Sequence, residues 1–203
     1  MKTRSAGILG VLAACLLVAV IAVLLTLPKP VQPPVPIGPR PFDTLHPHTQ
    51  AVFRRLGVAP ERVTQGIGAF PASAGIHSPD GTAQGRLYCA AFDLSVSDLH
   101  PAQTRILLGR LREAGFACWW RIPGVSFPLS TAGGIEAGAH IHGIDPFVPH
   151  KLRLEAQIRD YAAGRNGIEV GAYAHRPDPP AADPPTPAER RLLRQKGTVW
   201  HLH

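Results

Sequence analysis

The sequence lacks features that are typical of several common classes of protein. No block of five basic residues occurs, although 21 Lys and Arg against 14 Asp and Glu give a formal net charge of +7. The spread of these residues along the chain argues against nucleic acid as a partner. It is typical instead of a soluble surface near anionic lipid or wall polymer. Internal repeats are also absent, which excludes a repeat array.

Charge is missing altogether between Ala6 and Leu27. At about 1.5 Å per residue, such a helix spans roughly 30 Å, the thickness of the hydrocarbon core of a bilayer. Lys2 and Arg4 precede the run, so the positive-inside rule places residues 1–5 in the cytoplasm. The sequence therefore predicts a single-pass signal anchor over residues 6–27, with the rest of the chain on the periplasmic or extracellular side of the cell membrane.

Two alternatives remain for this segment. A cleaved signal peptide has an apolar core of about 7–15 residues and a small-residue cleavage site, whereas this core is longer and ends in Thr-Leu-Pro. The letters Leu12–Cys15 match a lipoprotein signal, but the apolar run continues beyond them. All three interpretations export the domain.

Proline divides the rest of the chain. Seven of the fourteen residues of segment 28–41 are proline, which predicts a semi-rigid, extended linker. A globular domain is expected over residues 42–175. Residues 176–203 are again rich in proline and are predicted to form a mobile tail with one short charged helix at about Pro187–Lys196.

Helical and strand patterns alternate within the domain, which predicts an α+β fold with helices packed on a small antiparallel sheet. Strand-like segments are Arg86–Val96, Phe116–Arg121 and Ala139–Ile144, and helices are expected at Thr49–Leu56, Pro101–Ala114 and Leu152–Ala163, with a further turn at Arg62–Ile67.

Cysteine is scarce: the chain has three, of which Cys15 lies in the anchor. Cys89 and Cys118 both lie in apolar, strand-like segments. In an oxidising compartment they could form a disulfide, or they could remain two buried thiols.

The strongest local motif is His140-Ile141-His142. On a strand, side chains at i and i+2 point to the same face, so both imidazoles project together. Histidine is the commonest metal ligand near neutral pH. An isolated pair of this kind is also compatible with a half-exposed surface.

Two upstream residues extend the motif. Asp93 lies in an otherwise apolar strand, where a carboxylate is costly to bury unless it is paired or bound to metal; alternatively it caps a turn. His77 lies in a turn-rich loop and could be an ordinary loop histidine. Together with His142 these residues would give zinc three protein ligands and leave a fourth position open, the pattern of a catalytic site.

The order of these motifs resembles the D-alanyl-D-alanine carboxypeptidase-like family of zinc peptidases, which has the hedgehog/DD-peptidase fold. The resemblance covers about residues 45–167. It implies that His77, Asp93 and His142 bind Zn²⁺ and that His140 either supports a ligand or stabilises the transition state.

The sequence departs from the family pattern in two places. His77 and Asp93 are sixteen positions apart where the family has seven, so Ser78–Tyr88 would be an inserted loop or hairpin, with Asp80-Gly81 as a turn. The family places an acidic base three residues before the last ligand, where this chain has Ala139. Glu136, in a glycine-containing segment, is the nearest carboxylate and is the predicted catalytic base.

The strand that ends at Arg121 carries candidate residues for substrate binding. Trp119 and Trp120 alternate along a strand, so one is expected in the core and Trp120 is assigned to a substrate groove. Arg121 could pair with a substrate carboxylate, or could be a surface arginine. Asp145 could orient a ligand imidazole or cap the next turn.

Three hypotheses follow. The first is a membrane-anchored zinc peptidase, of the DD- or LD-carboxypeptidase type, that acts on peptidoglycan peptides. The second is an anchored domain of the same fold that only binds wall peptide or a protein partner. The third is a structural domain without metal, in which His77, Asp93 and His142 do not converge.

Overall fold

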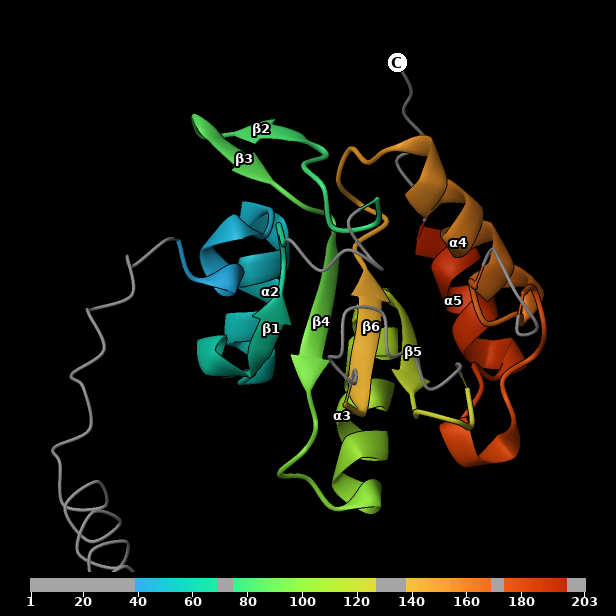
Figure 1. The fold of residues 1–203 in the computed structure, drawn as a ribbon. Coiled ribbons are helices and arrows are strands. Elements are labelled where there is room, and N and C mark those ends of the chain that lie inside the picture. The colour runs from blue at the N-terminus through green and yellow to red at the C-terminus, as the bar shows by residue number, and fades with distance from the viewer. Residues whose placement is uncertain (1–38, 69–74, 127–137, 169–173, 197–203) are drawn as a thin grey trace, which may run out of the picture. The chain divides into compact units, whose positions relative to one another are not determined.

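The structure is a computed structural model that describes residues 39–68, 75–126, 138–168 and 174–196. Its centre is a four-stranded antiparallel sheet in the order β1-β4-β6-β5, beside a separate hairpin, β2–β3 (Figure 1). The strands are β1 (Val63–Gln65), β2 (Gly81–Ala83), β3 (Arg86–Tyr88), β4 (Ala91–Ser95), β5 (Ala117–Arg121) and β6 (His140–Ile144). The helices are α2 (Pro47–Leu56), α3 (Pro101–Ala114), α4 (Leu152–Ala163) and α5 (Pro187–Lys196), with 3-10 turns at Pro41–Thr44, Pro60–Arg62 and Pro180–Ala182. The predicted α+β class, with helices packed on a small antiparallel sheet, is confirmed.

The helix boundaries follow from local signals. Pro101 occupies the first turn of α3, and His100 caps it together with Gln103 in a capping box. Gly115 ends α3 and Gly164 ends α4, each with a positive φ angle that a residue with a side chain rarely adopts. Helices α3 and α4 therefore have the bounds that the sequence predicts.

Period-two alternation gives the sheet two different faces. One face contributes Phe92 and Leu94 from β4, Trp120 from β5 and Ile141 from β6 to a large apolar cluster. Helix α2 adds Phe53 to this cluster, and helix α3 adds further leucines. The rings of Phe53, Phe92 and Phe116 meet edge to face, with centroids 4.9–5.8 Å apart. The principal core of the domain lies between this face and helices α2 and α3.

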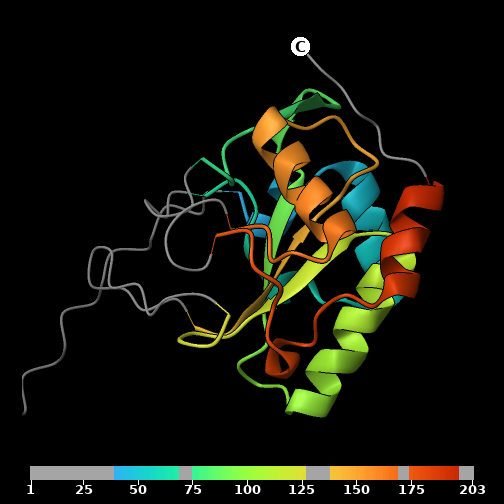
Figure 2. The ribbon, with the colours of Figure 1, turned by 90° about the vertical axis from the view of Figure 1, so that its right-hand side faces the viewer.

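The opposite face carries a smaller apolar cluster. Ala91 and Ala117 of the sheet pack with Leu154, Ile158 and Tyr161 of α4. Helix α5 packs against α4 and α3, and its Leu193 is buried in the same cluster (Figure 2). Polar residues occupy the rest of this face.

Three segments differ from their predicted form. The strand expected over Arg86–Val96 divides into β3 and β4. The segment Ser78–Tyr88 forms the hairpin β2–β3, whose chain reversal is at Gln84 and Gly85, both with positive φ, rather than at Asp80-Gly81. The turn expected over Arg62–Ile67 is largely strand β1, which forms because it pairs with the edge of β4.

The region predicted as a mobile tail is folded up to residue 196. Arg112 of α3 is buried, and its Nε donates to the carbonyl oxygen of Cys118 at 3.1 Å. Its Nη2 donates to the carbonyl oxygen of Asp183 at 2.8 Å, and Nη1 lies 3.6 Å from a Glu189 carboxylate oxygen. A buried guanidinium needs such partners, and the C-terminal segment supplies those of both Nη atoms. Residues 176–196 are therefore part of the domain.

Cys89 and Cys118 are free, buried thiols rather than a disulfide. They lie on opposite faces of the sheet, Cys118 in the cluster with α2 and α3 and Cys89 in the cluster with α4. Strand β6 also separates β4 from β5, and neighbouring strands are about 4.8 Å apart, so a bridge of at most about 7 Å between Cα atoms cannot form.

The predicted anchor over residues 6–27 and most of the linker lie outside the described residues. Within the described part of the chain, no helix has both the length and the apolar character that crossing a bilayer requires.

Candidate metal centre

Three of the predicted ligands meet on the polar face of the sheet. One ligand atom each from His77, Asp93 and His142 lies within 4.8 Å of the other two, and all three residues are buried. The three side chains converge, as a shared metal ion would require, so they could bind a metal ion.

The register of the sheet brings two of them together. Asp93 of β4 is directly opposite His142 of β6, and His142 is directly opposite Trp119 of β5. One step along the strands, His140 is opposite Arg121 in the same way. Directly opposed residues of an antiparallel pair point to the same side of the sheet, so these five side chains form a contiguous group.

A glycine next to His142 allows the strands to approach. A Cβ atom on Gly143 would lie 2.2 Å from the ring of Phe92 and 2.9 Å from Cys118 Sγ. The side chain that other residues carry is therefore excluded on the apolar face, directly beneath the site. This close approach explains why glycine follows the His140-Ile141-His142 motif.

His77 comes from a loop that the residues just after β1 hold in place. The backbone N–H of Gly68 donates to the carbonyl oxygen of His77 at 3.1 Å, and the Nδ1–H of His77 donates to the carbonyl oxygen of Gly66 at 3.0 Å. Since a carbonyl can only accept, the proton of a neutral His77 ring is on Nδ1. Its Nε2 carries the lone pair and lies 3.3 Å from Asp93 Oδ2. Fixing one ring nitrogen in this way is what proteins do for histidines that bind metals.

His142 is oriented by helix α4. Its Nε2 lies 3.1 Å from Gln157 Oε1, and its Nδ1 lies 2.8 Å from Asp93 Oδ1. When Nε2–H donates to Gln157, the short contact between Nδ1 and a carboxylate needs a proton or another cation between the two atoms. Burial lowers the pKa of His142, which favours the neutral imidazole that binds metals.

Asp93 supplies the negative charge of the group. Burial opposes ionisation of its carboxyl, but the positive charge and hydrogen bond that His77 offers when its ring is protonated, and the hydrogen bond from His142, hold the pKa of Asp93 well below the usual value. The carboxylate is therefore ionised at neutral pH, as a ligand must be.

The donor set fits a divalent cation with nitrogen and oxygen ligands. Two ligands of a tetrahedral zinc ion, with bonds of about 2.0–2.2 Å, lie roughly 3.3–3.6 Å apart. The 3.3 Å between His77 Nε2 and Asp93 Oδ2 matches this separation. Two imidazoles and one carboxylate also suit other transition metals, so the geometry indicates a metal site without giving the identity of the metal.

The structure describes only one of the two residues predicted to be catalytic. His140 lies beside the group, with its Nε2 4.0 Å from Asp93 Oδ1, and its Nδ1–H donates to the carbonyl oxygen of Gly138 at 2.8 Å. It is half-buried, whereas the three candidate ligands are buried. Glu136 lies outside the described residues.

The structure separates Trp120 from the site. Trp120 is buried on the opposite face of the sheet, in the cluster with α2 and α3, so it cannot line a groove beside the three candidate ligands. Its neighbour Trp119 is on the polar face, where its ring stacks on the His142 ring at a centroid distance of 5.9 Å. Alternation along the strand gives the two tryptophans opposite sides, but the sequence did not tell which side was which.

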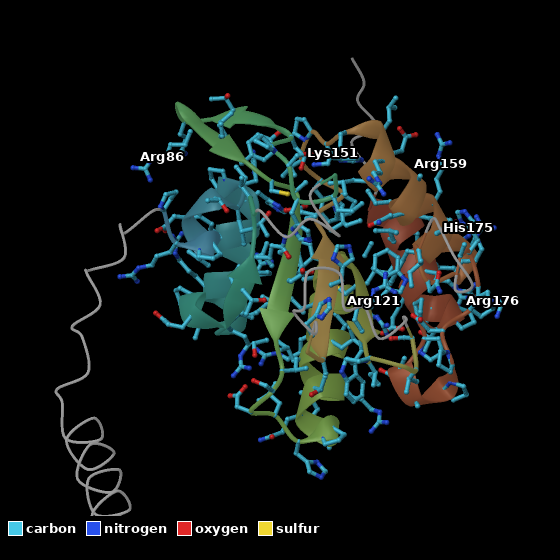
Figure 3. The ribbon with its side chains drawn as sticks, in the orientation of Figure 1. Arg86, Arg121, Lys151, Arg159, His175 and Arg176 are labelled. Carbon is cyan, nitrogen blue, oxygen red and sulfur yellow. The ribbon has the colours of Figure 1, made fainter. Side chains whose placement is uncertain are left out.

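Arg121 is on the polar face and is buried rather than a surface arginine (Figure 3). Its guanidinium lies over the Trp119 ring, 5.2 Å from the centroid, and its Nη2 donates to the carbonyl oxygen of Asn166 at 2.6 Å. Burial lowers the pKa of Arg121 to about 10, so the side chain remains a cation at neutral pH.

Asp145 does not orient a ligand imidazole. Its carboxylate accepts the Thr49 hydroxyl at 2.7 Å, lies 2.7 Å from His48 Nδ1 and accepts the backbone N–H of Phe147 at 3.0 Å. It therefore caps the turn after β6 and ties this turn to α2, the second of the two predicted roles.

Gln157 takes the orienting role, and sequence reasoning missed it. The signal was present, because Gln157 is one of two polar members, with Asp160, of the buried stripe of α4 that includes Leu154, Ile158 and Tyr161. A polar side chain on such a stripe requires a buried partner, and the partner is His142.

Comparisons of the chain with protein-family models, with curated proteins and with solved structures find no match.

Proposed function

We propose that the domain is a zinc-dependent peptidase-like protein of the hedgehog/DD-peptidase fold that acts on cell-wall peptides. The proposal depends on one observation above all: two buried histidines and a buried aspartate converge, and each histidine has its second ring nitrogen fixed by a polar partner. Zinc bound by such a set supplies Lewis-acid activation of a water molecule and of a scissile carbonyl.

The residues around the three ligands have distinct roles in this proposal. His140, which is more exposed than the three candidate ligands, would stabilise negative charge that develops on the substrate. Arg121 would hold an anionic group of the peptide, and Glu136 would accept the proton. An anchor over residues 6–27 and the proline-rich linker would place the domain next to the cell wall, outside the cytoplasm.

A second candidate function has its own support. The position three residues before His142 is Ala139 where the resembled family has an acid, and Asp93 is the one carboxylate that pairs with site histidines among the described ion pairs. A domain with this composition could keep the metal and bind wall peptide, or a protein partner, without cleaving it.

The test begins with the metal. The full chain, purified in mild detergent without a histidine tag, should contain about one zinc per chain by elemental analysis. His142→Ala should lose it, whereas His100→Asn, at the exposed start of α3, should retain it. If the wild-type protein takes up no zinc even when zinc is supplied, the zinc peptidase proposal is wrong.

Glu136→Gln then separates the two candidate functions. If the protein is a peptidase, this variant should retain zinc and lose turnover of wall peptides by about 10²-fold or more. If the domain only binds peptide, neither the wild-type protein nor the variant should release a product.

A further inference from the structure

Two segments, residues 164–168 and residues 174–178, lie side by side next to the β5 edge of the site. The loop that follows α4 and the segment before Pro179 pair through their backbones: Asn166 N donates to Arg176 O at 2.7 Å, and His175 N donates to Ile168 O at 2.8 Å. Trp119 Nε1 also donates to the carbonyl oxygen of Arg165 at 2.9 Å. The paired segments are thus joined to β5, the strand that carries Arg121.

Arg121 extends towards these paired segments, and one nitrogen of its guanidinium has no hydrogen-bond partner. The residue is only 6% exposed, and Nη2 is satisfied by Asn166, but Nη1 is buried and has no hydrogen-bond partner. Buried polar atoms are nearly always paired, and a buried charge costs more than a neutral group when it is left unpaired.

Asp178, at the end of the second paired segment, is a buried acceptor that also lacks hydrogen-bond partners. It is 5% exposed, and neither carboxylate oxygen has a hydrogen-bond partner. Burial raises its pKa to about 6, although Arg121 and Arg112 act in the opposite direction. Sequence reasoning assigned Asp178 to a mobile tail and gave it no role.

The two charges attract each other but do not touch. Among the charged groups, Asp178 does most to raise the pKa of Arg121, yet the two side chains make no direct hydrogen bond. A group that satisfies both must present an acceptor to Arg121 Nη1 and a donor to the Asp178 carboxylate. The head group of an α-amino acid carries a carboxylate and an ammonium on one carbon and meets both requirements.

We propose that Arg121 and Asp178 form a subsite for the zwitterionic head group of an amino acid. The ligand class is a free amino acid, or a residue that is attached to a peptide through its side chain, so that its α-amino and α-carboxyl groups are both free. That the rest of the ligand is a wall peptide rests on the proposed function. Arg121 is directly opposite His140 and one step from the His142–Trp119 pair, so the subsite lies next to the candidate metal centre.

Calorimetric titration of the full chain, both metal-free and zinc-loaded, tests the subsite with alanine of either hand as the probe. Alanine should bind, and N-acetylalanine and alaninamide should bind at least roughly tenfold more weakly, because each lacks one of the two charges. A bridging water molecule alone predicts no alanine binding to either form at millimolar concentration, and that result would overturn the subsite.

Substitutions assign the two charges. Asp178→Asn is close in shape and should remove the discrimination against N-acetylalanine while keeping that against alaninamide. Arg121→Gln should have the converse effect. Asp98→Asn and Arg105→Gln, both at exposed positions, are the matched controls and should leave both preferences intact. Circular dichroism checks folding, and unchanged discrimination in a folded Asp178→Asn variant contradicts the proposal.

Zinc content and peptide hydrolysis of the same samples keep the two proposals apart. Alanine binding without zinc uptake would leave the subsite standing and remove the peptidase. Zinc uptake and hydrolysis without alanine binding would do the reverse.

Discussion

The two faces of the central sheet are made by the same strands but are stabilised differently. On the face towards α2 and α3, Phe92, Trp120 and Ile141 alternate into a cluster of aromatic and aliphatic side chains. On the other face, their strand neighbours Asp93 and His142 are held by hydrogen bonds. The first face depends on apolar area removed from water, whereas the second depends on polar groups that satisfy one another.

This difference separates stability from function within one sheet. The apolar face tolerates no loss of volume without cost, because its interior is close-packed. On and beside the polar face, some buried groups have no hydrogen-bond partner, Arg121 Nη1 and Asp178 among them, and such groups lower stability. Substitutions on the two faces should therefore change different measured quantities.

The largest expected effect is on the apolar face. Phe92→Ala removes the ring that meets Phe53 and Phe116, and should lower the free energy of unfolding by about 3–5 kcal/mol. Urea denaturation measures this change. Phe147→Ala, at a half-buried position, is the control and should cost much less. If the folded fraction of Phe92→Ala bound added metal more weakly than the wild-type protein, the two faces would not be independent.

A pH-dependent effect of the opposite sign is expected for Asp178→Asn. The pKa of Asp178 is about 6 in the folded protein against an ordinary 3.8, so the native state binds more protons than the unfolded state between these values. The free energy of unfolding therefore falls as the pH rises from about 4 to about 6. Arg121 and Arg112 face the carboxylate and oppose this effect only in part.

Removing that charge should make Asp178→Asn about 1–3 kcal/mol more stable than wild type at pH 8, with no gain at pH 4. Urea denaturation across this pH range is the measurement. An equal gain at both pH values would show that the charge is not the cause.

On the polar face, Gln157→Leu should weaken metal binding by about 10–100-fold with little change in stability, because His142 loses the group that orients it. Gln157→Glu keeps an acceptor at the same place and should restore most of the affinity. Competition with a metal chelator measures both. Equal affinity of the Leu variant and the wild type would exclude the orienting role.

The smallest effect concerns the cysteines. Because Cys89 and Cys118 lie on different faces, a reducing agent should leave the urea midpoint unchanged, whereas loss of a disulfide would cost about 2–5 kcal/mol. Burial raises the pKa of Cys89 to about 12, so its thiol should react with alkylating reagents only after unfolding. Mass spectrometry of alkylated samples checks this.

Local patterns predicted much of the fold. Helices α3 and α4 have the predicted bounds because Pro101, Gly115 and Gly164 act within one turn of the helix ends. Strand β1 could not be predicted from Val63–Gln65 alone, since three residues have no measurable period and form a strand only through pairing with β4. The folding of residues 176–196 likewise depends on a distant residue, the buried Arg112.

The site divides in the same way. The sequence by itself determined that His140 and His142 share a face, because the period of a strand is two, and that a buried Asp93 needs a partner. Only the tertiary structure decided that His77 joins them, that Trp119 rather than Trp120 is on their side, that Gln157 contacts His142, and that Asp178 lies near Arg121. The physical reason is that periodicity fixes direction within one element, whereas strand register, loop closure and helix packing fix which elements meet.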